Sequence, residues 1–460
     1  MSGPKIFFAR LRDMAKRFDP RYVAFCKRTA EFRYPVAKLS ELLACPPEYG
    51  AGEAGKERTS IEQPRYIRIT DIDDNGELSG GLGATADTVE AKYFLSDGDL
   101  LFARSGATVG KCYLHEESRI KYPCFYAGYM IRMRLKPSVL PKYVFAFTQT
   151  SYYREWVASV QRAAGQPNIN AQEYCSLPLP LPPLDVQERL VAELDVAYAA
   201  KRAADEKATK FLASIDDMVL NELGIAKLPK PDTSLSSRIF TIPAREALNG
   251  RLDSYSYSPF FLDNLRRIRA SGSWRLGELV TLSHRQWDQK EWMGNVSGDF
   301  PYIEIGVISV EDGEIGVVER VPIADAPSRA KMMVVAGDLL VSLTRPTRRA
   351  IAFATEEAIA STGFAVIHGF SHEVIPEYLS VILRSELCTH QFDQRSTGGN
   401  YPAITEEQLL RCEIPIAAKE VQARIASAAS SIRTEARKLK ADATAALDAA
   451  KRKIEERIVG

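Results

Sequence analysis

The sequence predicts a mixed α/β fold in which two tandem-duplicated domains alternate with two long antiparallel coiled-coil helices about a pseudo-twofold axis. Three observations lead to this prediction. The second half of the 460-residue chain repeats the first, each half mixes short strand-like runs with helical stretches, and each half ends in a long segment with a regular apolar stripe. Hydrophobic residues make up 45% of the chain and charged residues 26%, which excludes wholesale disorder. No apolar run reaches the ~18 residues of a membrane span, which excludes an integral membrane protein.

The repeat is clearest where residues 141–190 align without a gap with residues 376–425. Gln187 corresponds to Gln422 in this alignment, so the offset between the halves is 422 − 187 = 235 residues. Further upstream, two more blocks match in the same order, residues 66–69 with 302–305 and residues 98–101 with 337–340. Agreement over several ordered blocks indicates a tandem duplication.

The same elements are expected in the same order in both halves. A strand-like run is followed by a Gly-containing turn, a β-rich run entered through Gly-Asp, a helical stretch, and a loop rich in Gly, Asn and Pro. In the first half these elements cover residues 65–69, 73–76, 99–103, 143–156 and 164–170. In the second half they cover residues 301–305, 311–313, 338–342, 378–392 and 398–404. Each domain, at ~180 residues, is long enough to bury its own core.

Each half then ends in a long predicted helix. The first is expected over residues 184–224, with Asp185 as its N-cap and Gly224 as its stop. The second is expected over residues 419–460, where apolar residues recur every three or four positions. At 1.5 Å per residue, ~35 helical residues make a rod of roughly 50 Å. Neither rod can bury its apolar stripe alone, and the obvious partner of each is the other helix.

The sequence contains no recognisable catalytic motif. It has no Walker A loop, no Rossmann Gly-x-Gly-x-x-Gly and no Asn/Asp-Pro-Pro-Tyr/Phe motif of an adenine methyltransferase, so we predict no catalytic residues. Lys plus Arg (60) balance Asp plus Glu (59), so any nucleic-acid-binding surface must be local. The seven cysteines form no Cys-x-x-Cys pair, which favours free thiols in a reducing compartment over a zinc site or a disulfide framework.

Two groups of residues could act as metal ligands, but the surrounding sequence favours other roles for them. His368 and His372 lie four residues apart, but a glycine between them argues against the helix that would bring both to one metal ion. Structural or solvated histidines are the favoured interpretation. The aspartates within residues 71–74 are followed by Asn-Gly, which favours a hairpin turn over a cation site. We therefore predict no metal site.

Loops suited to DNA follow the Gly-Asp-Leu-Leu runs and the helical stretches of both halves. Arg neutralises phosphates or reads guanine, Ser and Thr donate to phosphate oxygens, and Asn and Gln read adenine. Polar loops that cap helices are the alternative interpretation, but the matching places of these loops in both halves favour binding. The candidate DNA-binding residues are Arg104, Ser105, Arg162, Gln166, Asn168, Arg345, Thr347, Arg348, Arg349, Arg395, Asn400 and Tyr401.

Four local motifs occur in order along the chain. They are Gly-Asp-Leu-Leu-Phe at 98–102, Gly-Gln-Pro-Asn-Ile at 165–169, Leu-Pro-Leu-Pro-Pro at 179–183 running into Val-Gln-Glu-Arg, and Trp-Arg-Leu-Gly-Glu at 274–278. Together with two α/β domains that alternate with two long helices, this order resembles the specificity (S) subunit of type I restriction-modification systems. The resemblance spans essentially the whole chain.

The resemblance implies a division of the chain into target-recognition domain 1 (1–183), a central spacer helix (184–224), a linker with target-recognition domain 2 (225–418) and a C-terminal spacer helix (419–460). Each recognition domain would read one half of a bipartite sequence in double-stranded DNA. The helices would set the spacing between the half-sites and dock two methyltransferase subunits, with restriction subunits as further partners.

The resemblance also implies a chain without catalytic activity and without a cofactor of its own, because S-adenosylmethionine would bind the partner methyltransferase. The expected location is the cytoplasm of a prokaryotic cell, with no membrane partner.

Two other classes of function remain open. A coiled-coil scaffold that binds only proteins would share the long helices but would lack the steep salt dependence of DNA binding. A self-contained DNA methyltransferase or nuclease would need a catalytic motif that this sequence does not show.

Overall fold

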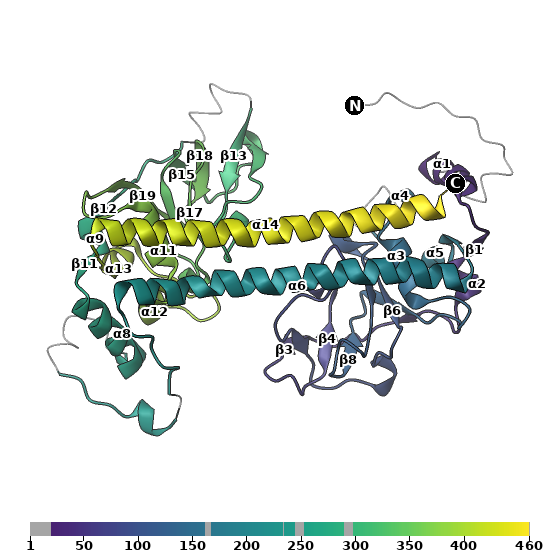
Figure 1. The fold of residues 1–460 in the computed structure, drawn as a ribbon, viewed down its shortest axis with the longest axis horizontal. Helices are drawn as coiled ribbons and strands as arrows, with labels where there is room; N and C mark the ends of the chain where they lie inside the picture. Colours follow the sequence, from purple (N-terminus) through teal and green to yellow (C-terminus); the bar gives the residue numbers. More distant parts are fainter. Residues whose placement is uncertain (1–19, 162–166, 233, 244–252, 289–297, 460) are drawn as a thin grey trace. The chain divides into compact units, whose positions relative to one another are not determined.

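The computed structural model describes residues 20–161, 167–232, 234–243, 253–288 and 298–459 (Figure 1). The chain divides into two compact units. Unit 1 comprises Met1–Ala203 and Ala441–Gly460, and unit 2 comprises Ala204–Lys440. Among the helices of the described residues, none combines the length and the hydropathy needed to cross a membrane.

Unit 1 contains two four-stranded sheets, in the orders β2-β9-β6-β7 and β3-β5-β4-β8, and a small sheet of β1 and β10. The strands are β1 (Val36–Lys38), β2 (Glu48–Tyr49), β3 (Lys56–Glu57), β4 (Arg65–Ile67), β5 (Ala84–Thr85), β6 (Leu100–Ala103), β7 (Cys112–Leu114), β8 (Cys124–Tyr126), β9 (Met130–Met133) and β10 (Pro178–Pro180). The helices are α1 (Pro20–Arg28), α2 (Leu39–Leu42), α3 (Pro141–Thr148), α4 (Ser151–Val160), α5 (Ala171–Cys175), the first half of α6 (Leu184–Leu223) and the second half of α14 (Lys419–Ile458).

Unit 2 contains sheets in the orders β12-β19-β16-β17 and β14-β13-β18-β15, and a small sheet of β11 and β20. The strands are β11 (Ser273–Arg275), β12 (Val280–Leu282), β13 (Asp299–Ile303), β14 (Glu319–Pro322), β15 (Ala330–Val334), β16 (Leu339–Ser342), β17 (Ile351–Phe353), β18 (Ala358–Ser361), β19 (Phe364–Phe370) and β20 (Glu413–Pro415). The helices are α8 (Pro259–Ala270), α9 (Leu276–Leu279), α11 (Pro376–Arg384), α12 (Glu386–Arg395), α13 (Glu406–Leu410) and the first half of α14 (Lys419–Ile458).

The two units share the strand order of their first four-stranded sheet and part of the order of their second sheet. The order β2-β9-β6-β7 corresponds strand by strand to β12-β19-β16-β17. The second sheet of each unit contains one parallel pair, β4 with β8 or β13 with β18, which lies at the edge of the sheet in unit 1 and at its centre in unit 2. This agreement is what the predicted repeat requires, and the predicted mixed α/β class is confirmed. That a duplication produced the repeat stays a prediction.

The Gly-Asp pair of each repeat has a structural role at the entrance to the central strand. Asp99 and Asp338 are 2% and 1% exposed, and the glycine before each has a positive φ that favours glycine. Asp99 accepts a hydrogen bond from the Ser96 amide at 3.0 Å, and Asp338 accepts one from the Val335 amide at 2.9 Å. Asp338 also contacts His368 Nδ1 at 2.6 Å, which gives this histidine a structural contact. The turn thus starts β6 and β16, whose residues are all buried.

The matched glutamines explain why the Val-Gln motif recurs at the start of each long helix. Gln187 Oε1 accepts from the Leu140 amide at 2.9 Å, and Gln422 Oε1 accepts from the Ile375 amide at 2.8 Å. Each Nε2 donates to a carbonyl in the turn before its long helix, at 2.8 and 2.9 Å. Both glutamines are 1% exposed, so they fix the start of α3 or α11 against the start of α6 or α14.

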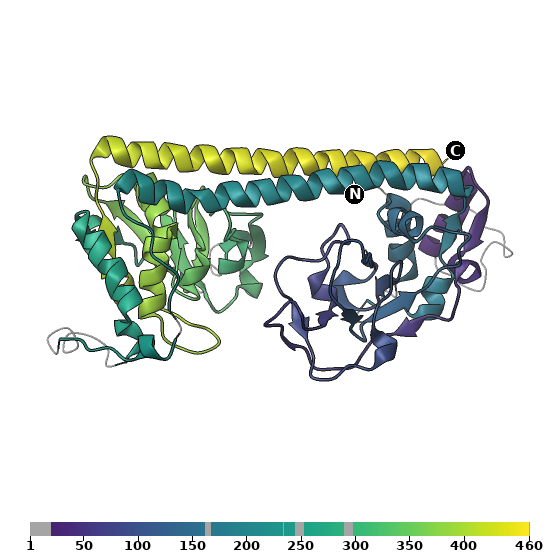
Figure 2. The same cartoon turned by 60° about the horizontal axis from the view of Figure 1, so that its bottom comes forward.

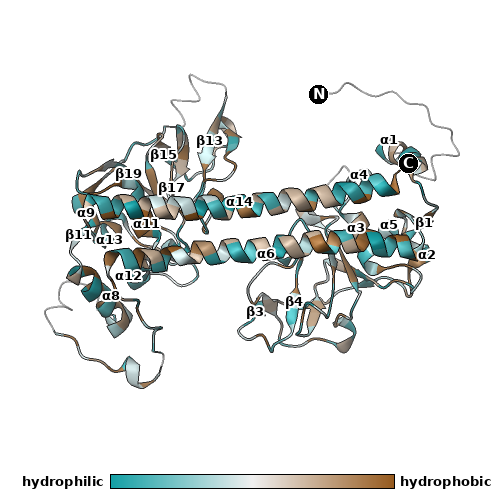
Figure 3. Ribbon diagram, in the orientation of Figure 1, coloured by the Kyte–Doolittle hydropathy of each residue, from teal (hydrophilic) through white to brown (hydrophobic). Residues whose placement is uncertain are grey.

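The two predicted long helices are present as α6 and α14, each of 40 residues. In unit 1, Leu190 of α6 lies in one core with Leu447 and Ile454 of α14. In unit 2, Leu220 of α6 lies in one core with Ile425 of α14. Within each unit the two helical segments lie side by side with opposite chain directions (Figures 1 and 2). Polar and apolar residues alternate along both helices, as amphipathic helices of a coiled coil require (Figure 3).

The aspartate cluster of the first half forms the hairpin turn that the sequence favours over a cation site. Asp73 N donates to Glu77 O at 2.9 Å, and Gly76 has φ +75°. Lys451 Nζ of α14 donates to Asn75 Oδ1 at 2.7 Å, and Tyr198 of α6 donates to the Asn75 carbonyl at 2.7 Å. The turn therefore anchors the second sheet to both long helices within unit 1. In the described part of the chain, no group of three or more His, Cys, Asp or Glu side chains is arranged to hold a metal ion.

Candidate nucleic-acid interface

In unit 1, the loop after β6 lies against residues 167–170, so two segments that are distant in sequence meet. Gly106 N donates to Pro167 O at 3.0 Å, and Ile169 N donates to Arg104 O at 2.9 Å. Ser105 and Asn168 form a β-bridge between the same segments. The structure thus brings Arg104, Ser105 and Asn168 together. The other two candidates of this half, Arg162 and Gln166, lie outside the described residues.

The Arg104 guanidinium lies over the ring of Tyr49, with its Cζ 4.9 Å from the ring centroid. Tyr49 is the last residue of β2, and its hydroxyl accepts a hydrogen bond from the Ala171 amide at 3.3 Å. Arg104 Nε is buried, and within the described residues the Arg104 side chain makes no hydrogen bond. No local pattern in the sequence points to Tyr49, because only the strand order β2-β9-β6 brings it beside the loop.

Two buried tyrosines support the base of the Arg104 loop. Tyr174 donates its hydroxyl to Ala103 O at 2.6 Å and accepts from Gly110 N at 3.2 Å. Tyr153 donates to Gly110 O at 2.8 Å. Burial raises the pKa of both tyrosines, so both hydroxyls stay protonated and keep donating at neutral pH. Hydrogen bonds from these two tyrosines therefore hold the ends of the loop in place.

In unit 2, the loop after β16 lies against the segment that contains Tyr401. Arg345 N donates to Pro402 O at 2.7 Å, and Ile404 N donates to Leu343 O at 3.0 Å. The short helix η10 (Pro346–Arg348) follows, and it carries Thr347 and an exposed Arg348.

Backbone strain is concentrated in this loop. Arg345 (φ +50°) and Arg349 (φ +63°) are the non-glycine residues with positive φ in the described part of the chain. Such conformations cost about 1–3 kcal/mol each and cluster at functional sites. The strained loop is therefore a candidate site on backbone geometry alone.

The side chain of Arg345 meets two other candidates. Its Cζ lies 4.3 Å from the ring centroid of Tyr401, and its Nη2 donates to the Asn400 carbonyl at 3.0 Å. Tyr401 is 69% exposed, so this ring gains little from packing in the free protein. Arg345, Asn400 and Tyr401 form one cluster at the loop after β16. Arg104 and Tyr49 form a cluster at the loop after β6, although the backbone bonds match Arg345 with Gly106 and not with Arg104.

Two of the candidate DNA-binding residues are bonded to other residues of the protein. Arg349 Nη1 forms an ion pair with Asp216 Oδ2 of α6 at 2.8 Å. Arg395 Nη1 donates to the Gln391 carbonyl at 3.2 Å and to Gln394 Oε1 at 3.1 Å. A DNA contact by either arginine would require these bonds to be exchanged.

A buried arginine that the sequence analysis did not single out supports the end of the unit 2 loop. Arg384 of α11 is 6% exposed and donates to the carbonyls of Val310, Arg349 and Ile351. Burial, with smaller effects of Arg433 and Arg349, lowers the pKa of Arg384 to about 9, so its charge is kept at pH 7. Arg384 thus fixes the carbonyl of a strained residue.

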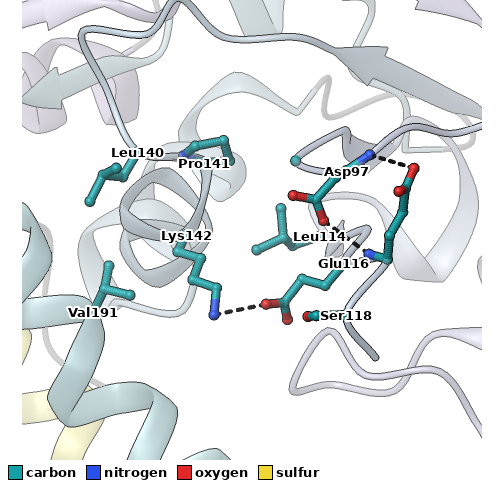
Figure 4. A pocket seen from close by; sticks show the side chains of 10 residues that line it. Asp97, Leu114, Glu116, Ser118, Leu140, Pro141, Lys142 and Val191 are labelled. Atoms are coloured by element: carbon teal, nitrogen blue, oxygen red, sulfur yellow. Dashed lines mark hydrogen bonds and ion pairs between the residues drawn. The ribbon is translucent and has the colours of Figure 1, made fainter. Parts of the chain in front are cut away.

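An acidic hollow of about 500 Å³ lies in unit 1, lined by residues other than those of the Arg104 loop (Figure 4). Lys142 Nζ pairs with Glu116 Oε1 at 2.8 Å, while Asp97 and Glu117 accept hydrogen bonds from each other's amides. The lining carries three carboxylates and one ammonium group, so it repels DNA phosphates. The hollow is no candidate for the nucleic-acid interface.

Part of the chain matches a known protein family. The profile of the family Methylase_S, described as the type I restriction modification DNA specificity domain, matches residues 272–445. The specificity subunit of the type I restriction enzyme HindI of Haemophilus influenzae (strain ATCC 51907 / DSM 11121 / KW20 / Rd) is 32% identical over 108 residues. Residues 272–445 therefore match the type I specificity domain family. The resemblance predicted from the motifs is confirmed.

Two further relatives belong to the type I specificity family. The HindI match covers 22% of this chain and 24% of that subunit. The StySPI specificity subunit of Salmonella potsdam is 24% identical over 105 residues, which are 23% of each chain. This chain thus spans about a quarter of the length of the curated relatives it matches. The type I restriction-modification S subunit of M. genitalium has a TM-score of 0.40 and 11% identity to this chain, over 93% of this chain and 96% of that one.

Proposed function

We propose that this chain is the DNA-specificity subunit of a type I restriction-modification complex and that each α/β domain reads one half of a bipartite DNA target. The proposal rests mainly on an arginine–tyrosine cluster in each unit, Arg104 with Tyr49 and Arg345 with Tyr401, in a chain whose residues 272–445 match the type I specificity domain. Each cluster follows the central strand of its sheet, where loops can reach a ligand while the sheet holds them rigid.

The chemistry of the predicted residues supports duplex DNA as the ligand. Arginines neutralise phosphates or read guanine, hydroxyls such as those of Ser105 and Thr347 donate to phosphates, and the amides of Asn168 and Asn400 can read adenine. Arg162, Gln166, Arg349 and Arg395 remain part of the proposed interface.

We propose that the protein partners dock on the long helices, with residues 1–183 and 225–418 as the two recognition domains. Forty residues of helix correspond to about 60 Å, more than the ~34 Å of one turn of DNA, so helices of this length can set a spacing between half-sites. In this proposal two methyltransferase subunits bind S-adenosylmethionine and transfer the methyl group, restriction subunits join the complex, and the chain itself has no catalytic role. The proposed location is the prokaryotic cytoplasm.

DNA binding by this chain should depend steeply on salt. An interface with six to ten phosphate contacts loses about 10³- to 10⁵-fold in affinity between 50 and 200 mM salt. We expect a loss in this range for duplex DNA, measured by fluorescence anisotropy on the full chain, alone and with its methyltransferase. Absent binding, or binding insensitive to salt, would favour the coiled-coil scaffold. Methyl transfer by the purified chain alone would contradict its assignment as a non-catalytic subunit.

A further inference from the structure

We propose that the pairs Arg104–Tyr49 and Arg345–Tyr401 each read one guanine in the major groove, so that every half-site contains a guanine recognised by a tyrosine-supported arginine. This inference rests on the proposed function and deepens it. It adds Tyr49 to the interface and separates arginines that read a base from arginines that only neutralise phosphate.

The backbone of both arginines is fixed before any ligand binds. Arg104 N donates to Tyr129 O at 3.0 Å, and Arg104 O accepts from Ile169 N at 2.9 Å. Arg345 N donates to Pro402 O at 2.7 Å and holds a left-handed conformation. Holding a non-glycine residue in this conformation costs free energy, so the position of this one side chain is maintained at the expense of folding stability.

The guanidinium groups are fixed as well. Each lies over a tyrosine ring, 4.9 Å from the centroid in unit 1 and 4.3 Å in unit 2. A guanidinium is a planar fork of five N–H donors, and a ring beneath it restricts the orientation of that plane. Bidentate contact with guanine O6 and N7 requires a defined plane, whereas a phosphate accepts hydrogen bonds from many directions. A fixed guanidinium therefore favours guanine over phosphate.

The two tyrosines come from different elements, and each lies beside an arginine in the loop after the central strand. Tyr49 belongs to β2, whereas Tyr401 belongs to the segment before α13. Both rings are exposed, at 43% and 69%, so burial of the rings does not explain the arrangement. What the units share is an arginine after the central strand with an aromatic support, and this shared feature points to a ligand.

The other arginines of the unit 2 loop differ in ways that suit other roles. Arg348 is exposed and lies over none of the described rings, which fits a phosphate contact. Arg349 is paired with Asp216. Within this loop, Arg345 alone combines a strained backbone with an aromatic support among the described residues.

The test uses the full chain in complex with its methyltransferase and a duplex that carries the methylated target. Each guanine is replaced in turn by 7-deazaguanine, which lacks the N7 acceptor and keeps O6. For the unchanged chain, we expect affinity to fall about tenfold at one guanine in each half-site. Arg345→Ala should abolish this sensitivity in one half-site, and Arg104→Ala should abolish it in the other.

Three further variants serve as controls. Arg348→Ala should weaken binding and keep the sensitivity to 7-deazaguanine. Tyr401→Phe should also keep it, because the ring remains, whereas Tyr401→Ala should reduce it several-fold at the guanine assigned to Arg345. Because Tyr401 is exposed, its variants should fold normally.

The inference would be overturned if Arg345→Ala kept its full sensitivity to 7-deazaguanine at every guanine, or if a half-site contained no guanine. Either result would leave the proposed function intact. Failure of the unchanged complex to bind any duplex would instead overturn the proposed function.

Discussion

Replacement of both Arg345 and Arg348 by alanine should abolish recognition of one half-site. The sequence of the other half-site, which the other domain recognises, should stay unchanged. Both residues belong to one loop of unit 2, and Arg104 and its loop belong to unit 1. Loss of a bidentate base contact costs about 1–3 kcal/mol, and loss of a phosphate contact lowers the salt slope by about 0.9. We therefore expect a fall in affinity of about 10- to 100-fold. The measurement is the methylated motif produced by the variant complex.

The matched control is Arg266→Ala in the same unit. Arg266 lies on α8, its side chain is 75% exposed, and it pairs with Asp263 one helical turn away. Its loss should leave both half-sites and the affinity unchanged. Equal relaxation of both half-sites by the Arg345 and Arg348 variant would contradict two independent recognition modules.

Arg384→Met should destabilise unit 2 by about 3–4 kcal/mol and weaken reading of the half-site assigned to that unit. Methionine preserves much of the buried volume but leaves the carbonyls of Val310, Arg349 and Ile351 without their donor. Each buried group left unsatisfied costs about 1–3 kcal/mol. The strained Arg349 also loses its anchor, so the loop should sample other conformations. Urea unfolding of the full chain and the methylated motif measure the two effects.

Arg411→Met is the matched control for this variant. Arg411 is 59% exposed and pairs with Glu407 one turn earlier in sequence, an interaction worth at most about 0.5 kcal/mol. If Arg384→Met and Arg411→Met unfolded at the same urea midpoint, the buried arginine would not be what holds the loop.

The long helices and the turns were predictable because their signals are local. Two prolines, a regular apolar stripe and Gly224 are enough to place α6 at Leu184–Leu223. The prediction of Asp185 as the N-cap is wrong, because the helix begins at Leu184 and Asp185 lies in its first turn. The Gly-Asp pair likewise predicts the start of a strand, because its glycine has the positive φ of a turn. The Asn-Gly pair at 75–76 predicts the hairpin for the same reason.

The partners of the candidate arginines were not predictable because they come from distant parts of the chain. Tyr49 reaches Arg104 only through the order of three strands, and β2 has two residues, too few for an alternating pattern. Asp216 reaches Arg349 from α6, across 133 residues of sequence. In both cases tertiary packing decides which guanidinium stays available to a ligand, and packing leaves no local pattern in the sequence.

The most direct measurement is to co-express this chain with the methyltransferase encoded beside it and to map methylated adenines in the host DNA. We predict a split motif, with two short specific halves on either side of a fixed run of unread bases. Exchange of residues 242–418 for those of a relative should then change one half only. A soluble complex that methylates nothing, or one that methylates a single unsplit motif, would contradict the bipartite assignment.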